Sequence, residues 1–113
     1  MVHIAREITR FSSKKELDKI FKKARRAIKT QELVILVAPA RKDIGRILVI
    51  ASRKVGKAHE RNKIRRQMRS IFYEEALFKQ GLDCIVIVKP GGIKLPFAKL
   101  KQLLIQAVST NTS

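Results

Sequence analysis

The segment of residues 53–69 reads RKVGKAHERNKIRRQMR and connects two kinds of pattern. Before it, residues 46–52 are apolar and rich in β-branched side chains, which is typical of a buried strand. Within it, Ile64 and Met68 stand four residues apart and begin an apolar stripe that predicts a helix over residues 58–79. The sequence therefore predicts a strand that leads into a basic helix.

The polar side of this expected helix is strongly basic. On a helical wheel, Asn62, Arg65, Arg66 and Arg69 fall together on the side away from Ile64, and we call these four residues the arginine face. A guanidinium group forms paired hydrogen bonds with phosphate oxygens, whereas like charges four residues apart on a helix repel each other. We therefore interpret the arginine face as a contact for phosphates rather than as a solvated helix surface.

Further elements are predicted upstream of this segment. Ser13 and Glu16 have the spacing of a capping box, which predicts a helix over residues 14–27. Residues 33–38 form an apolar run that predicts a buried strand, and a further short strand is expected near residues 26–30.

The order of the strands is predicted from the connections between them. The short loop of residues 41–45 favours a hairpin, in which strands 33–38 and 46–52 would be antiparallel neighbours. Downstream, residues 83–88 predict a third buried strand, and Pro96 suits the first position of a last helix.

The charge of the chain points to an anionic partner. Its 113 residues include 26 Lys and Arg against 9 Asp and Glu, which gives a formal net charge of +17. Residues 1–30 hold ten basic and three acidic side chains, and residues 53–69 hold eight and one. Two blocks of this kind favour a nucleic acid or an anionic membrane as the partner.

Length and composition limit the other possibilities. We expect one domain over residues 1–113, with a polar tail at residues 108–113. Cys84 is the only cysteine and lies in an apolar run, so we expect an inert core thiol. No apolar stretch reaches the roughly 18 residues of a membrane span, and the first residues lack a signal-peptide pattern, so the expected location is the cytoplasm.

Residues 52–66 resemble the signature of the protein subunit of bacterial ribonuclease P. That signature consists of two basic residues, an aliphatic residue, Gly-Asn-Ala-Val, one variable residue and Arg-Asn-Arg-Ile-Lys-Arg. The chain reads SRKVGKAHERNKIRR over the same positions, and the similarity extends over nearly its whole length. It departs from the pattern at Lys57, where Asn is usual, and at His59, where Val is usual.

The resemblance implies a fold. The family has an α+β sandwich, in which a small, mostly antiparallel four-stranded sheet packs against three helices in the order αβββαβα. The basic helix lies in a left-handed β-α-β crossover, although such crossovers are right-handed in nearly all proteins.

The resemblance also implies a function. In this family the RNA subunit hydrolyses precursor tRNA with bound Mg²⁺ and removes the 5′ leader, while the protein binds both RNA molecules. The implied partners are therefore the catalytic RNA and precursor tRNA with its 5′ leader, and the sequence predicts no catalytic residue and no metal site in the protein itself. No oligomeric state is assigned.

Two groups of binding residues follow from the same resemblance. The residues matched to the RNA-subunit contact are Arg53, Lys54, Lys57, Arg61, Asn62, Lys63, Arg65, Arg66 and Arg69. The residues matched to a cleft for the leader are Arg10, Phe11, Leu17 and Phe21. Leu17 stands where the family usually has a second aromatic side chain, which favours charge and apolar contact over base stacking in this cleft.

The sequence leaves three other classes of function as alternatives. A structural RNA-binding protein of ribosomal type fits the composition alone. A DNA-binding module is disfavoured because the basic helix follows a strand rather than a helix-turn-helix pair. A membrane-surface role is weaker still, because the basic helices have apolar stripes to bury within the domain.

Overall fold

The sheet of the protein is built from four strands, β1 (Arg25–Lys29), β2 (Leu33–Pro39), β3 (Ile47–Ala51) and β4 (Leu82–Val88). The structure is a computed structural model that describes residues 4–11 and 13–110. Over these residues the helices are α1 (Ile4–Glu7), α2 (Lys14–Lys23), α3 (Ala58–Glu74) and α4 (Phe97–Ser109). Single turns of 3-10 helix are η1 (Arg53–Val55), η2 (Leu77–Gln80) and η3 (Gly92–Lys94).

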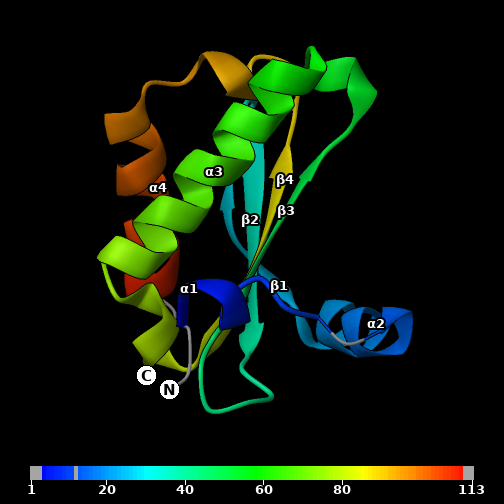
Figure 1. Cartoon of the computed structure of the whole chain (residues 1–113), viewed down its shortest axis with the longest axis vertical. Helices are drawn as coiled ribbons and strands as arrows, with labels where there is room; N and C mark the ends of the chain where they lie inside the picture. The colour runs from blue at the N-terminus through cyan, green and yellow to red at the C-terminus, as the bar shows by residue number, and fades with distance from the viewer. Residues whose placement is uncertain (1–3, 12, 111–113) are drawn as a thin grey trace.

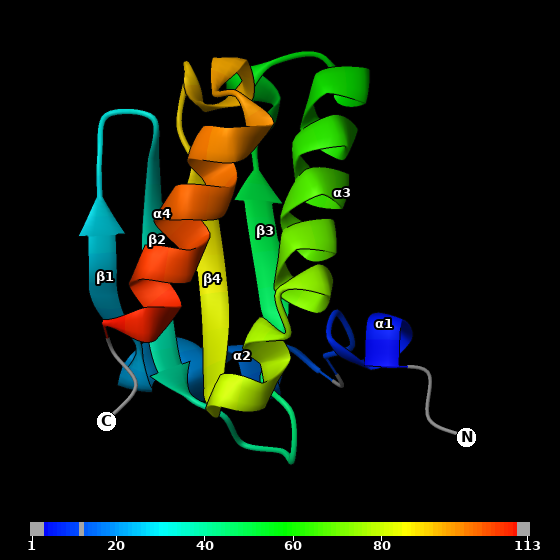
Figure 2. The ribbon, with the colours of Figure 1, turned by 90° about the vertical axis from the view of Figure 1, so that its left-hand side faces the viewer.

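The strands are arranged in the order β1-β2-β4-β3, seen edge-on in Figure 1 and side by side in Figure 2. The pairs β1–β2 and β2–β4 are antiparallel, and the pair β3–β4 is parallel. Two of the three pairings are thus antiparallel, and the longer helices and the strands follow the predicted order. The short strand expected near residues 26–30 is β1.

The expected hairpin between β2 and β3 is wrong, because β4 lies between these two strands. Residues 40–46 do not pair the two strands but bind the segment that leads into β4. The amide of Ala40 donates to the carbonyl of Gly81 at 2.9 Å, and the amide of Gly45 donates to the carbonyl of Phe78 at 2.8 Å. These bonds satisfy polar groups of the loop backbone. They also join the loop to the segment that precedes β4, the strand that lies between β2 and β3.

The crossover from β3 through α3 to β4 is left-handed. Figure 2 views the sheet from the side that the helices cover, and there β3 rises, α3 descends in front of the sheet, and β4 rises to the left of β3. The handedness implied by the family resemblance is therefore confirmed.

Helices α3 and α4 cover one face of the sheet (Figures 1 and 2). The core between the layers contains Ile35 of β2, Val86 of β4, Met68 and Phe72 of α3, and Leu104 of α4, none of which has exposed surface. This packing buries the apolar stripe of α3, so the opposite side of the helix faces solvent.

Three predicted boundaries are wrong for local reasons. Helix α2 ends at Lys23 rather than near Ala27, because Ala24 is extended and the chain continues into β1. Helix α3 ends at Glu74 rather than at residue 79, because Ala76 adopts a left-handed conformation with φ of 52°. The predicted polar tail at 108–113 begins too early, since α4 continues to Ser109, and residues 111–113 lie outside the described part of the chain.

A buried arginine ties α2 to the sheet. The side chain of Arg46 is 1% exposed, and its Nη1 contacts Glu16 Oε1 of α2 at 2.6 Å. On its other side, the backbone amide of Arg46 donates to Asp83 Oδ1 at 2.9 Å, and Nη2 lies 3.5 Å from Asp83 Oδ2. The guanidinium also lies over the ring of Phe11, 4.7 Å from its centroid. The start of α2 is thereby held against the uncovered face of the sheet.

Candidate nucleic-acid interface

The arginine face forms on the solvent side of α3, as predicted. Asn62, Arg66 and Arg69 are exposed, while Arg65 is half-buried. Arg65 Nη2 donates to the carbonyl of Ala51 at 3.1 Å, and Arg65 Nη1 donates to Asn62 Oδ1 at 3.2 Å. Arg65 therefore fixes α3 to the end of β3, whereas Arg66 and Arg69 present their charge outward.

The entrance to α3 carries three further predicted residues. Arg53 and Lys54 lie in η1 and Lys57 precedes the first residue of α3, and all three are exposed. Glu60 Oε1 accepts the backbone amide of Lys57 at 2.8 Å, which satisfies one of the free donors at the helix start. A Cβ at Gly56 would meet Ile93 Cδ1 at 2.5 Å, so a larger residue here would require the Ile93 side chain to shift.

The remaining two predicted residues lie on the two flanks of α3. Lys63 is exposed, and on the helical wheel it falls on the opposite flank of α3 from Arg61. Arg61 is half-buried, and its Nε is buried without a hydrogen-bond partner. The nine predicted residues therefore lie along α3 and its entrance, and four of them form the arginine face.

None of the ion pairs among the described residues joins these basic side chains to a carboxylate. The one acidic residue of this segment, Glu60, binds a backbone amide instead. Unpaired like charges held close together favour an anionic ligand, because only an external anion offsets their repulsion.

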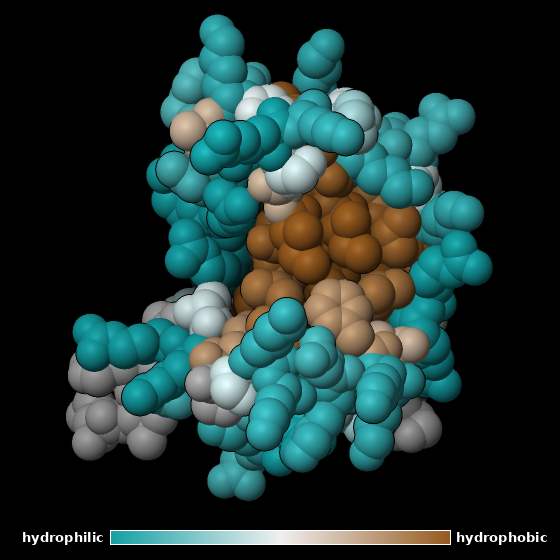
Figure 3. Space-filling model, turned by 90° about the vertical axis from the view of Figure 1, so that its right-hand side faces the viewer, coloured by the Kyte–Doolittle hydropathy of each residue, from teal (hydrophilic) through white to brown (hydrophobic). Residues whose placement is uncertain are grey.

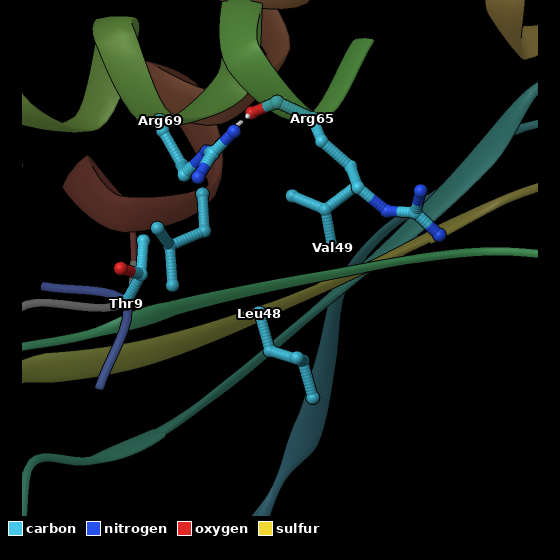
Figure 4. A pocket seen from close by; sticks show the side chains of 6 residues that line it. Thr9, Leu48, Val49, Arg65 and Arg69 are labelled. Carbon is cyan, nitrogen blue, oxygen red and sulfur yellow. Dashed lines mark hydrogen bonds between the residues drawn. The ribbon is translucent and has the colours of Figure 1, made fainter. Parts of the chain in front are cut away.

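Two hollows flank Arg69. The first has a volume of about 240 Å³ and is lined by Thr9, Ile47, Leu48, Val49, Arg65 and Arg69 (Figure 4). The second has a volume of about 260 Å³ and is lined by Ile8, Arg66, Arg69, Ser70 and Tyr73. In Figure 4 the guanidinium groups of Arg65 and Arg69 point in different directions, so the two cations are spread along the surface.

Sequence reasoning missed Tyr73 and the residues of the N-terminal segment that line these hollows. Tyr73 follows Arg69 by four residues and Arg66 by seven, which places it on the same stripe of α3. Extending the helical wheel past the last arginine would have included it. No sequence pattern indicates that Ile8 and Thr9 lie beside α3.

The second predicted surface is the face of the sheet that α3 and α4 leave uncovered. Strands β2, β3 and β4 contribute mostly aliphatic side chains to this face, and Figure 3 shows an apolar hollow surrounded by hydrophilic residues. The aliphatic side chains on this face include Val34 and Leu36 of β2, Leu48 and Ile50 of β3, and Ile85 and Ile87 of β4. Ile50, on the edge strand β3, is 37% exposed.

Helix α2 and the segment before it carry the four predicted cleft residues. Phe11 is half-buried and packs with Ile20 of α2 against the sheet, and Arg10 is exposed and pairs with Glu7 at 3.4 Å. Leu17 is half-buried and Phe21 is 38% exposed, on one flank of α2. The buried residue of α2 is the neighbouring Ile20.

The described residues contain no group of three or more His, Cys, Asp or Glu side chains placed to hold a metal ion. His59 is exposed in the first turn of α3, and His3 lies outside the described residues. Burial raises the pKa of the Cys84 thiol to about 12, so the thiol stays protonated and unreactive at neutral pH. None of the described helices is long and apolar enough to cross a membrane.

Comparison with known proteins gives one consistent family. Residues 6–111 match the family model described as Ribonuclease P. The ribonuclease P protein component of Bacillus pumilus is 32% identical over 96 residues, which cover 84% of this chain and 81% of that protein. The corresponding protein of Dictyoglomus turgidum is 44% identical over 64 residues, which cover 54% of each chain.

Solved structures agree on the fold. The ribonuclease P protein of Thermotoga maritima superposes with a TM-score of 0.75 at 24% identity, covering 92% of this chain and 98% of that one. The protein of Staphylococcus aureus superposes with a TM-score of 0.73 at 21% identity, covering 90% and 94%. With its sequence match over nearly the full length, the chain belongs to the family of ribonuclease P protein components, which take part in the processing of tRNA 5′ ends.

Proposed function

We propose that this protein binds the catalytic RNA of ribonuclease P through the arginine face and the entrance to α3, and holds the 5′ leader of precursor tRNA on the uncovered sheet face beside α2. In this proposal the RNA, with its bound Mg²⁺, cleaves the leader, and the protein supplies affinity for the substrate. Binding on two surfaces joins catalyst and substrate in one complex, which raises the effective concentration of each for the other.

The observation that carries the proposal is the unpaired charge of α3. Arg66 and Arg69 are exposed, and among the described residues neither contacts a carboxylate. Arg65 is held by Ala51 and Asn62, so part of the surface is ordered before any ligand binds. A preorganised cationic surface of this kind suits the closely spaced phosphates of a folded RNA.

The leader is a single strand, and the uncovered sheet face suits a flexible single strand better than a duplex. The hollow is apolar, and Phe21 is an exposed aromatic side chain on the helix at its end. Bases without a pairing partner can lie on such a surface, while sugar and phosphate groups remain at its hydrophilic rim. Because the strands of this face carry no aromatic side chain, apolar contact rather than stacking holds most of the leader.

The test is a cleavage assay with defined components. The purified protein is mixed with a bacterial ribonuclease P RNA and a precursor tRNA that carries a 5′ leader, at a Mg²⁺ concentration where the RNA alone is slow. We expect the protein to accelerate removal of the leader. A rate no higher than that of the RNA alone overturns the proposal.

A matched control variant distinguishes binding at the arginine face from nonspecific attraction between a basic protein and RNA. The double variant Arg66→Ala/Arg69→Ala removes two cations from the arginine face, and Lys42→Ala/Lys99→Ala removes two exposed cations elsewhere. We expect only the first to reduce the acceleration. Equal losses in both would indicate nonspecific attraction between a basic protein and RNA.

A further inference from the structure

Tyr73 lies at the end of the arginine face. It occupies the last turn of α3, and Asn62, Arg66, Arg69 and Tyr73 follow one another at spacings of four, three and four residues. These spacings place the four side chains on one stripe of the helix. Tyr73 is 46% exposed, the largest value among the exposed large hydrophobic residues of the described part of the chain.

The ring of Tyr73 is supported from within the protein. It stacks on the ring of Phe78 of η2, with the centroids 6.0 Å apart and an angle of 21° between the planes. Phe78 is itself buried, so it limits the orientations that the tyrosine ring can adopt. An aromatic ring fixed in this way loses little conformational freedom when a ligand stacks on it.

The second hollow brings the ring and two cations together. Tyr73, Arg66 and Arg69 line the same 260 Å³ space, and Ile8 and Ser70 complete its wall. The nearest acidic residues in sequence are Glu74 and Glu75, and Glu75 contacts Lys101 at 3.8 Å. An aromatic ring beside two guanidinium groups is the combination by which proteins hold an unpaired nucleotide, because the base stacks and the phosphate is neutralised.

We infer that Tyr73 is a base-stacking residue for one unpaired nucleotide of the catalytic RNA, whose phosphate groups bind Arg66 and Arg69. This inference rests on the proposed function and extends it from phosphate contact to contact with a base. It also assigns a role to the N-terminal segment, because Ile8 lines the hollow together with residues of α3.

The chain offers a direct probe of this contact. Tyr73 is the only tyrosine and the chain has no tryptophan, so emission excited in the tyrosine absorption band, where phenylalanine does not absorb, reports on this ring alone. We expect a ribonuclease P RNA to quench the emission after correction for absorption by the RNA. Inorganic polyphosphate, which carries phosphates without bases, should bind and leave the emission nearly unchanged. Equal quenching by both overturns the inference.

Affinity gives the second readout. Dissociation constants for the same RNA are measured over a range of salt concentrations with Tyr73→Phe, Tyr73→Leu and Arg69→Ala. Tyr73→Phe should bind within about two-fold of the parent, and Tyr73→Leu should bind about five-fold to one hundred-fold more weakly, the range expected for the loss of one stacked base. Both Tyr73 variants should keep the parent's salt dependence, whereas Arg69→Ala should lower it.

The control variant is Phe97→Leu, because Phe97 is also an exposed aromatic residue but lies on α4. If Tyr73→Leu binds like the parent while Arg69→Ala is weakened, the stacking contact is wrong and the proposed function stands. If Tyr73→Leu and Phe97→Leu are weakened equally, the loss is not specific to this site and the inference fails. If the parent does not bind the RNA, the proposed function fails together with the inference.

Discussion

The buried side chain of Arg46 holds α2 in place against the sheet. Its guanidinium lies between Glu16 of α2 and Asp83 of β4, and the ring of Phe11 packs against it. Burial raises the pKa of Asp83 above its ordinary value, and the contacts from Arg46 lower it in part. The ion pairs therefore compensate for charges that the fold has removed from water.

We predict that Arg46→Met lowers the free energy of unfolding at neutral pH by about 3–5 kcal/mol, because Asp83 and Glu16 lose their buried partner. Without the cation, the pKa of Asp83 rises further in the folded state than in the parent. A raised carboxyl pKa favours folding at low pH, and this benefit is lost as the pH rises through the folded-state pKa. The destabilisation should therefore be small near pH 4 and grow toward pH 7.

Urea denaturation of parent and variant between pH 4 and pH 7 measures this trend. The double variant Arg46→Met/Asp83→Asn is the control, since it removes the carboxylate as well and should recover part of the lost stability at pH 7. A destabilisation that is equal at both ends of the pH range would assign Arg46 to packing alone.

Among the elements, α2 is the part of the proposed leader site that a mutation can test without unfolding the protein. Phe21 is 38% exposed and does not belong to the buried cluster that joins α2 to the sheet. We predict that Phe21→Ala leaves the midpoint of thermal unfolding nearly unchanged. It should weaken binding of leader-bearing precursor tRNA by about five-fold or more, through the loss of contact with a base.

The measurement compares precursor tRNAs with leaders of increasing length, bound to the complex of the protein and the catalytic RNA. The parent should gain affinity as the leader lengthens, and Phe21→Ala should gain less. Phe97→Ala, in an exposed aromatic residue of α4, serves as the control. The same gain for parent and Phe21→Ala would remove Phe21 from the leader site.

The elements themselves differ in how well the sequence predicts them. The buried side of α3 follows from Ile64 and Met68, and its basic side follows from the arginines, because both depend only on local helical spacing. The position of β4 between β2 and β3 depends on contacts such as the one between Arg46 and Asp83, which are 37 residues apart. No local pattern contains that information, and the left-handed crossover was expected only from the family resemblance.

The same distinction applies to the candidate site. The arginine face was predicted because its residues are close in sequence, and the structure also gives Arg65 a structural role that its residue type did not reveal. Tyr73 lies beyond the basic run and was missed. The uncovered sheet face is assembled from three strands, so its apolar hollow could be described only once the sheet order was known.

For the whole molecule, the two surfaces should differ in how binding depends on salt. The arginine face is cationic, whereas the uncovered sheet face is apolar at its centre (Figure 3). We predict that Arg66→Ala/Arg69→Ala lowers the slope of log affinity against log salt for the catalytic RNA by roughly 1.5, because fewer counterions are released. Binding isotherms at several salt concentrations measure this slope.

Phe21→Ala is the control for this experiment. It should change affinity for the leader, but the slope of log affinity against log salt for the catalytic RNA should stay the same as in the parent. Arg65 is left intact in these experiments because its bond to Ala51 joins α3 to β3. An unchanged slope in the double arginine variant would remove these residues from the interface.

The sheet order also affects how the protein folds during its synthesis on the ribosome. β4 pairs with both β2 and β3, yet it is the last of the four strands to be synthesised. Until residue 88 has emerged, β1 and β2 can form a hairpin, but β3 has no strand to pair with and its apolar side chains are exposed. The sheet therefore closes in one late step, and any chain that stops before β4 lacks the platform on which both proposed RNA surfaces are built.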